Sequence, residues 1–204
     1  MRRKRIIISA LILSLIIPFF PVSAVSFSGV SDRLGSSWPG GNSNHTINFR
    51  TATAIPPGGR IVVEPLHGAW RAWPALSYAD LDLATSTVRL GPYVDRSLAS
   101  SSAPGVDGVA VSANASGTLA AITVTLNPAY GIAAGTYVEM RIGTNAVFGA
   151  TGTGQILNAT TTGTHYIRVR STDPAGVALD QSEIALAIVD PVAMGGNIEK
   201  IRSN

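Results

Sequence analysis

Short runs in which apolar and polar residues alternate recur along this chain of 204 residues. In THYIRVR, Ile167 and Val169 lie opposite Tyr166, Arg168 and Arg170. Successive side chains of a β-strand point to opposite faces, so this period of two is typical of a strand with one buried face. No window shows a convincing helical period over three turns, and only residues 74–86 are ambiguous. The pattern predicts an all-β fold.

Four further segments are expected strands, among them residues 119–126, in which Ile122, Val124 and Leu126 share one face. In residues 44–51, Ile47 and Phe49 share one face, while Asn48 and Arg50 share the other. In residues 136–142, apolar residues alternate with three polar ones: Tyr137, Glu139 and Arg141. Residues 183–189 are apolar on both faces, which favours a more buried strand.

Clusters of proline and glycine separate these runs, for example in residues 36–44, 55–60 and 171–176. Proline fixes φ and glycine allows positive φ, so such clusters reverse the chain. Many short strands with a turn roughly every ten residues indicate an antiparallel β-sandwich of the immunoglobulin-like kind. One turn pattern occurs twice: Ile55 and Ile132 each stand three residues before a glycine, Gly58 and Gly135, that leads into a strand. We interpret this as one entry turn used twice in a single sandwich, with two half-domains as the alternative.

The first 24 residues have the layout of a cleavable signal peptide. Four basic residues at positions 2–5 precede an apolar run over residues 6–17, and small residues follow at positions 22–24. The apolar run is shorter than the ~20 residues that span a bilayer as a permanent helix. We predict cleavage after Ala24, with an uncleaved anchor as the alternative. The expected plan is a signal peptide over residues 1–24, one β-sandwich domain over 25–192 and a flexible tail over 193–204.

The charge of the mature chain argues against nucleic acid as a partner. The whole chain has 15 Lys and Arg residues and 12 Asp and Glu residues, and four of the bases lie in the first five residues. The remainder therefore carries 11 minus 12, or −1. The chain has no cysteine, which excludes disulfides and thiolate catalysis. No second long apolar run follows, so we expect no membrane span after signal cleavage and a secreted or cell-surface protein.

Residues 142–170 hold five glycines and no lysine. A phosphate-binding P-loop needs a lysine directly after its last glycine, and a dinucleotide loop needs a strand before it and a helix after it. Neither condition is met, so we interpret this stretch as a glycine-rich connection between two strands.

Three segments together resemble a known group of proteins: SDRLGSSWPGGNSNHTINFRTATAIPPGGRIVV, YADLDLA and IGTNAVFGATGTGQILNATTTGTHYIRV. They are similar to secreted surface proteins of poorly characterised bacteria that carry immunoglobulin-like β-sandwich modules. The resemblance covers most of residues 26–190 and implies a surface or adhesive role. Its motifs consist of turns and strands, so it supplies no functional residue.

The segment EPLHGAWRAWP is the most distinctive candidate site. Trp70 and Trp73 flank Arg71, and His67 lies nearby. Exposed tryptophan rings could stack on sugars while the guanidinium binds hydroxyl groups. The other interpretation, which the bulk of the rings favours, is that one or both tryptophans close the end of the core.

A second candidate is the segment YADLDLA, where Asp80 and Asp82 alternate with apolar residues. Two carboxylates on one strand face could bind calcium together with loop carbonyls. Calcium takes six or more oxygen ligands, and the sequence names only two, so an ordinary solvated face is the simpler interpretation. No other cofactor is expected.

The sequence offers little for catalysis. His45 and His165 are expected on inward strand faces, and no histidine pair has the spacing of metal ligands. No GxSxG motif occurs, although a glycosidase pair drawn from Glu64, Glu139 and Glu183 remains open. We therefore expect a structural or adhesive module without catalysis, which binds a protein or glycan at the cell surface. The alternatives are a carbohydrate-binding module that uses the Trp/Arg segment and a self-assembling surface-layer or fibre subunit.

Overall fold

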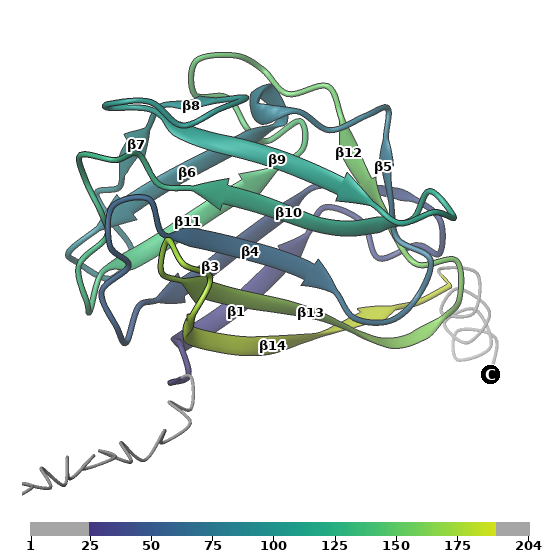
Figure 1. The fold of residues 1–204 in the computed structure, drawn as a ribbon. Coiled ribbons are helices and arrows are strands. Elements are labelled where there is room, and N and C mark those ends of the chain that lie inside the picture. The colour runs from purple at the N-terminus through teal and green to yellow at the C-terminus, as the bar shows by residue number, and fades with distance from the viewer. Residues whose placement is uncertain (1–24, 191–204) are drawn as a thin grey trace, which may run out of the picture.

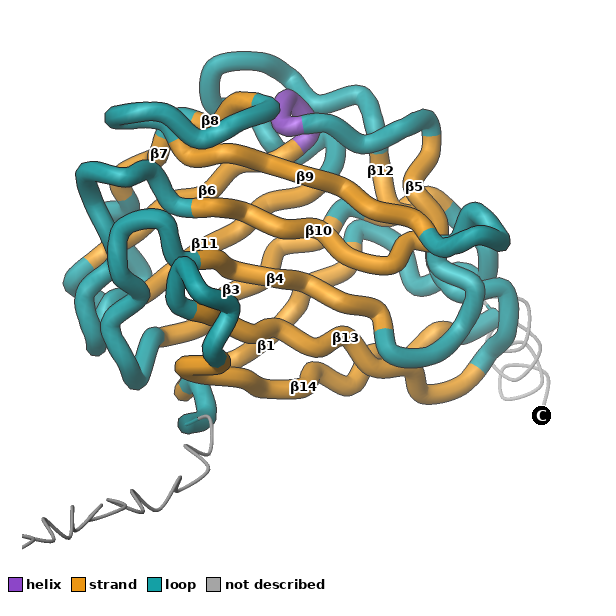
Figure 2. Tube along the Cα trace, in the orientation of Figure 1, coloured by secondary structure: helices purple, strands orange, loops and turns teal. Residues whose placement is uncertain are grey.

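A computed structural model describes residues 25–190, and these residues form a β-sandwich (Figures 1 and 2). In strand order, one sheet contains β1 (Ser28–Leu34), β3 (His45–Arg50), β11 (Tyr137–Ile142), β6 (Leu81–Ser86) and β7 (Val94–Arg96). The facing sheet contains β14 (Ala178–Ile188), β13 (Gly163–Thr172), β4 (Arg60–Pro65), β10 (Leu119–Thr125), β9 (Asp107–Ala113) and β8 (Leu98–Ala99).

Smaller elements complete the fold at one end of the sandwich. A short sheet pairs β2 (Asn42–Ser43), β12 (Gln155–Leu157) and β5 (Arg71–Trp73). The 3-10 turn η1 (Tyr78–Asp80) directly precedes β6, so the ambiguous residues 74–86 become a turn and a strand. Neighbouring strands pair antiparallel except β8 and β9, which are parallel. The prediction of an all-β sandwich is confirmed.

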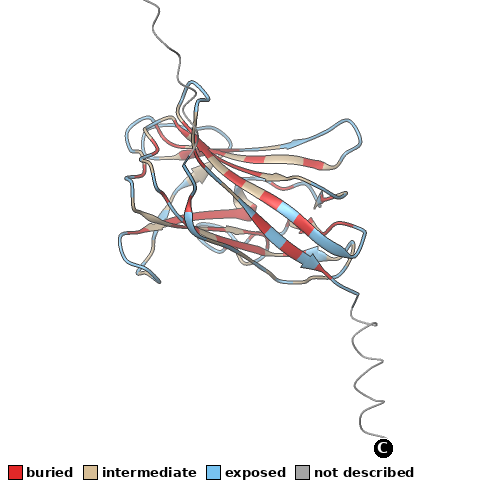
Figure 3. Ribbon diagram, turned by 90° about the horizontal axis from the view of Figure 1, so that it is seen from below, coloured by how far each residue is buried: buried red, intermediate tan, exposed pale blue. Residues whose placement is uncertain are grey.

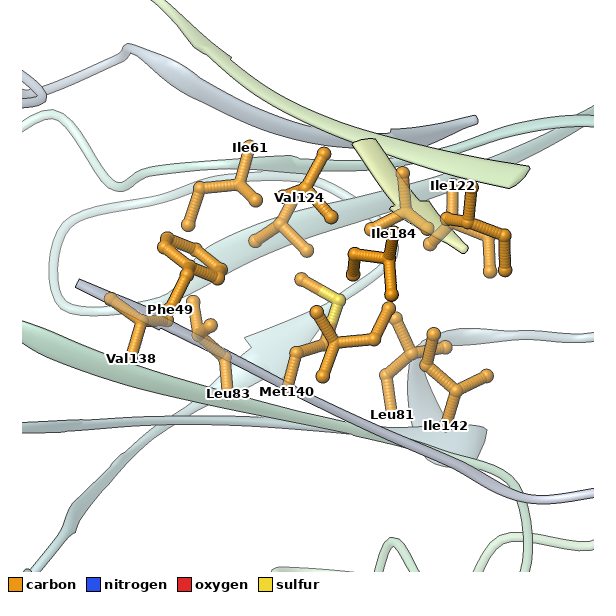
Figure 4. Packing of buried hydrophobic residues seen from close by; sticks show 14 of the residues in the cluster. Phe49, Ile61, Leu81, Leu83, Ile122, Val124, Val138, Met140, Ile142 and Ile184 are labelled. Atoms are coloured by element: carbon orange, nitrogen blue, oxygen red, sulfur yellow. The ribbon is translucent and has the colours of Figure 1, made fainter. Parts of the chain in front are cut away.

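Buried residues recur along the strands of both large sheets (Figure 3), and their apolar side chains meet in one core (Figure 4). Phe49, Leu83 and Met140 rise from the first sheet toward Ile61 and Val124 of the second. Four of these residues belong to the apolar half of an alternating run, whereas Ile61 lies in a continuous apolar run of β4. The alternation therefore places side chains correctly, because one face of each strand is buried against the other sheet.

The expectation of a more buried strand at residues 183–189 is wrong. β14 is the edge strand of its sheet, and only one of its faces is buried. Ile184 and Leu186 point into the core, whereas Ala185 and Ala187 are exposed. Alanine on the outer face makes the segment look apolar throughout. The alanine side chain is small, so its exposure to water costs little free energy.

The two copies of the repeated turn lie against each other. Ile55 and Ile132 exchange two backbone hydrogen bonds of 2.8 Å each, and both side chains are buried. One copy leads into β4 and the other into β11, which belong to opposite sheets. The repeated sequence pattern thus joins the two layers at one end of the sandwich.

Sheet structure begins with the first described residue. Val25 donates to the carbonyl of Leu179 at 2.9 Å and accepts from the amide of Gln181 at 2.8 Å. The predicted signal peptide, the last residues of the predicted domain and the predicted tail lie outside the described residues. Within residues 25–190, no helix is long and apolar enough to cross a membrane.

Candidate binding groove

The structure divides the predicted Trp/Arg segment into a buried part and an exposed part. Trp70 has no exposed surface, and its indole Nε1 donates to the carbonyl of His67 at 2.6 Å. His45 and His165 lie edge-on near the indole, each with its ring centroid 6.0 Å away. An exposed stacking role for Trp70 is therefore wrong, because its ring closes the end of the core.

The rest of that segment stays on the surface. Arg71 and Trp73 are two residues apart on β5, so they share a face, and 63% of Trp73 is exposed. His67 is also exposed, and its ring packs edge-on against Tyr166. A sugar-stacking surface here would have one tryptophan where two were expected.

Asp80 and Asp82 are both buried, which corrects the interpretation of a solvated face. Asp80 Oδ1 accepts the amides of Thr153 and Gly154 at 2.7 and 2.6 Å, and Oδ2 accepts from Ser77. Burial alone would raise the pKa of Asp80, but these backbone amides and the Ser77 hydroxyl lower it below its ordinary 3.8.

Asp82 holds the same connection at a second point. Its Oδ2 accepts the amide of Val147 at 2.7 Å, and both oxygens are 3.2 Å from the amide of Phe148. The two carboxylates thus anchor the glycine-rich connection, which links β11 to β13 as expected but also contains the short strand β12. N–H donors surround these oxygens where a calcium site would need further oxygen ligands, so the geometry argues against the calcium hypothesis. No group of three metal-binding side chains occurs within residues 25–190.

The acidic residues considered for catalysis have structural partners. Each of the three strand glutamates pairs with an arginine at 2.8–3.1 Å: Glu64 with Arg170, Glu139 with Arg141, and Glu183 with Arg168.

The histidines expected on inward faces are indeed buried. His45 Nδ1 lies 2.7 Å from Asp32 Oδ2, and neither side chain is exposed. This dyad resembles a general-base pair, but a general base must touch its substrate. The core encloses the imidazole, so the dyad is out of a substrate's reach.

A groove of about 760 Å³ lies on the outer face of the five-stranded sheet. Its floor is formed by β3 and β11, one side by β1, and the other side by the loop between β6 and β7. Leu90, at φ +67°, is the one non-glycine residue with positive φ in the described part of the chain, and it lines this loop side. No pattern in the sequence indicates this groove, because the loop and the sheet face come together only in the fold.

Register arranges the strand residues that line the groove in three rows across the sheet. The first row contains Ser28, Arg50 and Tyr137, the second contains Ser31, Asn48 and Glu139, and the third contains Arg33, Thr46 and Arg141. These are the outward members of the alternating strands. Polar outer faces on residues 44–51 and 136–142 were thus the available sequence signal, but nothing in the sequence shows that these two strands are adjacent.

Positive charge dominates the groove. Four arginines line it (Arg33, Arg50, Arg89 and Arg141), against one carboxylate, Glu139. Arg141 is paired with Glu139, and Arg50 Nε donates to the carbonyl of Gly135 at 2.9 Å. The guanidinium groups of Arg33 and Arg89 have no hydrogen-bond or ion-pair partner within residues 25–190.

Tyrosines from two elements add aromatic surface. Tyr137 lies on β11, and the Arg50 guanidinium carbon stands 5.4 Å from its ring centroid. Tyr93 comes from the β6–β7 loop. Burial raises the pKa of Tyr93 above its ordinary 10.0, and the nearby Glu139 and Tyr137 raise it further, so its phenol is a neutral donor at physiological pH.

Comparison with known proteins yields similar folds only. No protein-family model matches the sequence, and no curated protein matches it. An uncharacterised Nocardia farcinica protein with an immunoglobulin-like fold is 12% identical with a TM-score of 0.36, over 79% of this chain and 98% of that one. The collagen-binding domain of a Staphylococcus aureus adhesin is 10% identical with a TM-score of 0.38, over the same shares. An Archaeoglobus fulgidus cohesin is 10% identical with a TM-score of 0.34, over 86% and 99%.

Proposed function

We propose that this chain is an exported β-sandwich module that works by binding, as a structural or adhesive component outside the cell. The observation that carries the proposal is the open groove, in which Arg33 and Arg89 have no protein partner. Arginines that stabilise a fold are usually paired, as Arg96 is with Asp107 at 2.6 Å. Unpaired guanidinium groups over a polar groove are available to an anionic partner.

The remaining ionisable groups support binding over catalysis. The Asp32–His45 dyad is enclosed, and the strand glutamates face arginines. A reaction needs a reactive side chain that a substrate can touch. The groove offers charge, hydroxyl groups and aromatic surface, which suit recognition.

The test is retention of purified residues 25–204 on isolated cell envelopes of the producing organism. We expect retention that weakens as salt increases, because exposed charge pairs are screened. The variant Arg33→Ala/Arg89→Ala should lose at least tenfold in affinity. Equal retention of this double variant, with an unchanged melting temperature, would rule out the groove as the binding site.

Exposed Arg71 and Trp73 favour a second candidate, a carbohydrate-binding surface on β5. The variant Arg71→Ala/Trp73→Ala serves as the matched control, since it also removes an exposed arginine and lies at a different place on the sandwich. If this variant loses retention and the groove variant does not, the β5 surface is the binding site.

A further inference from the structure

The groove has the features of a site for an elongated sugar chain that carries acidic groups. We propose that it binds an acidic polysaccharide, with arginines holding the anionic groups and Tyr93 packing against a sugar ring. This inference rests on the proposed binding function and names the ligand class of the same groove.

Cations stand at both ends of the groove floor. Arg33 and Arg141 flank Thr46 in the third row, while Arg50 stands in the first row. Thr46 and Arg50 are four residues apart on one strand, which corresponds to roughly 14 Å at about 3.4 Å per residue. A ligand that contacts both ends must therefore be elongated, and it must carry more than one anionic group.

The middle of the groove is suited to neutral hydroxyl groups. Asn48 and Glu139 are paired across β3 and β11 in the second row, between the cationic rows. Amide and carboxylate groups can accept from hydroxyls, and the Asn48 amide can also donate. Tyr93 lines the groove as a neutral phenol with an aromatic face. An aromatic ring offers an apolar contact to a sugar ring, and nearby polar groups fix the orientation of that sugar.

Two other anionic polymers fit less well. An extended acidic peptide gains much of its affinity by pairing its backbone with a sheet edge, but the floor of this groove is the face of β3 and β11, and the edge strand β1 lines only one side. Nucleic-acid binders neutralise many phosphates along a continuous basic surface, whereas the cationic rows of this groove are separated by Asn48 and Glu139, whose carboxylate would repel a phosphate.

Binding of purified residues 25–204 to defined polymers tests the proposal by biolayer interferometry. The probes are polygalacturonate for carboxylated sugar chains, dextran sulfate for sulfated ones, neutral dextran, and poly-glutamate for peptides. We expect binding to polygalacturonate or dextran sulfate, with at least fivefold tighter binding than to poly-glutamate and none to neutral dextran. The preferred acidic polymer identifies the anionic group.

Variants separate sugar recognition from simple charge attraction. Tyr93→Ala should weaken binding at least fivefold, whereas Tyr93→Phe, which keeps the ring, should stay within twofold of the parent. Arg33→Ala/Arg89→Ala should weaken it at least tenfold. Thermal melts verify that each variant is folded.

Poly-glutamate binding equal to that of the sugars, or full binding by Tyr93→Ala, would overturn the polysaccharide assignment. If neither acidic sugar binds while groove-dependent retention on envelopes persists, the ligand class is wrong and the proposed binding function still stands. If groove-dependent retention is also absent, both proposals fail.

Discussion

At the residue scale, the buried Asp80 carboxylate ties η1 to the glycine-rich connection. Asp80→Asn keeps the shape but replaces one acceptor oxygen by a donor that faces backbone N–H groups. Hydrogen bonds to charged groups contribute about 1.5–3 kcal/mol each, so we expect a loss of about 2–3 kcal/mol at pH 7. Urea unfolding measures this loss. Asp95→Asn is the control, because Asp95 is exposed on β7, and it should change stability little.

The lowered pKa of Asp80 also gives its contribution a definite pH dependence. A carboxyl whose pKa is lower in the folded state than in the unfolded state stabilises the fold fully above the unfolded value. That contribution is lost as the pH falls below about 3.8 and through the folded pKa. The stability difference between the parent and Asp80→Asn should therefore shrink in acid. A difference that is constant from pH 7 to pH 2.5 would contradict this account.

Calcium should have no effect on stability. The Asp80 and Asp82 oxygens already accept backbone hydrogens, so a cation would have to displace those donors. We expect the same melting temperature in EDTA and in millimolar calcium. A rise in the melting temperature of several degrees with calcium would restore the metal hypothesis.

Tryptophan positions make a further prediction. Trp70 is buried, whereas Trp38 and Trp73 are largely exposed. Truncation of a large buried aromatic costs about 3–5 kcal/mol, so Trp70→Ala should unfold far more easily than Trp73→Ala. Trp70→Phe should remove the blue-shifted part of the emission spectrum, which fluorescence measures directly. A parent-like spectrum for Trp70→Phe would place another tryptophan in the core.

At the element scale, the paired turns at Ile55 and Ile132 leave no room for a side chain at Gly131. A Cβ there would contact the Ile55 carbonyl oxygen and the Pro56 backbone. We expect Gly131→Ala to cost about 1–3 kcal/mol, as overpacking does, measured as a lower melting temperature. Ala134→Ser changes an exposed residue in the same turn and should be near neutral. If both variants melt at the same temperature, the two turns pack less tightly than the structure indicates.

Strands were predictable where one face is buried, because alternation then follows directly from packing. Ile167 and Val169 lie inward as expected, and so do His45 and His165. The β14 segment was misjudged because alanine fits either environment. The groove could not be predicted, since it depends on β11 lying between β3 and β6, strands that are far apart in the sequence. Local patterns show which face of a strand is polar, but strand order decides which polar faces meet.

At the scale of the whole molecule, export is a prediction about the first 24 residues. Expressed from its full sequence in a secreting bacterium, the protein should appear outside the cytoplasm with Val25 as its first residue. Val25 bonds to β14, so the residue that the expected cut would leave first is part of the described fold. Mass spectrometry of the secreted or envelope fraction identifies the N-terminus. Full-length protein retained in the membrane would instead favour the uncleaved anchor.

The attachment of Val25 to β14 has a mechanical consequence. Val25 bonds to β14 near Asp180, and β14 then runs away from that point to the far end of the sandwich, where Val189 donates to Ser37 (Figure 1). Strand hydrogen bonds lie across the strand direction. Tension between residues 25 and 190 would therefore pull along β14. The hydrogen bonds that join β14 to Val25 and to β13 would be loaded in shear, so several of them must break together before the sandwich opens. A module that is anchored at one end and pulled at the other would resist force along its long axis.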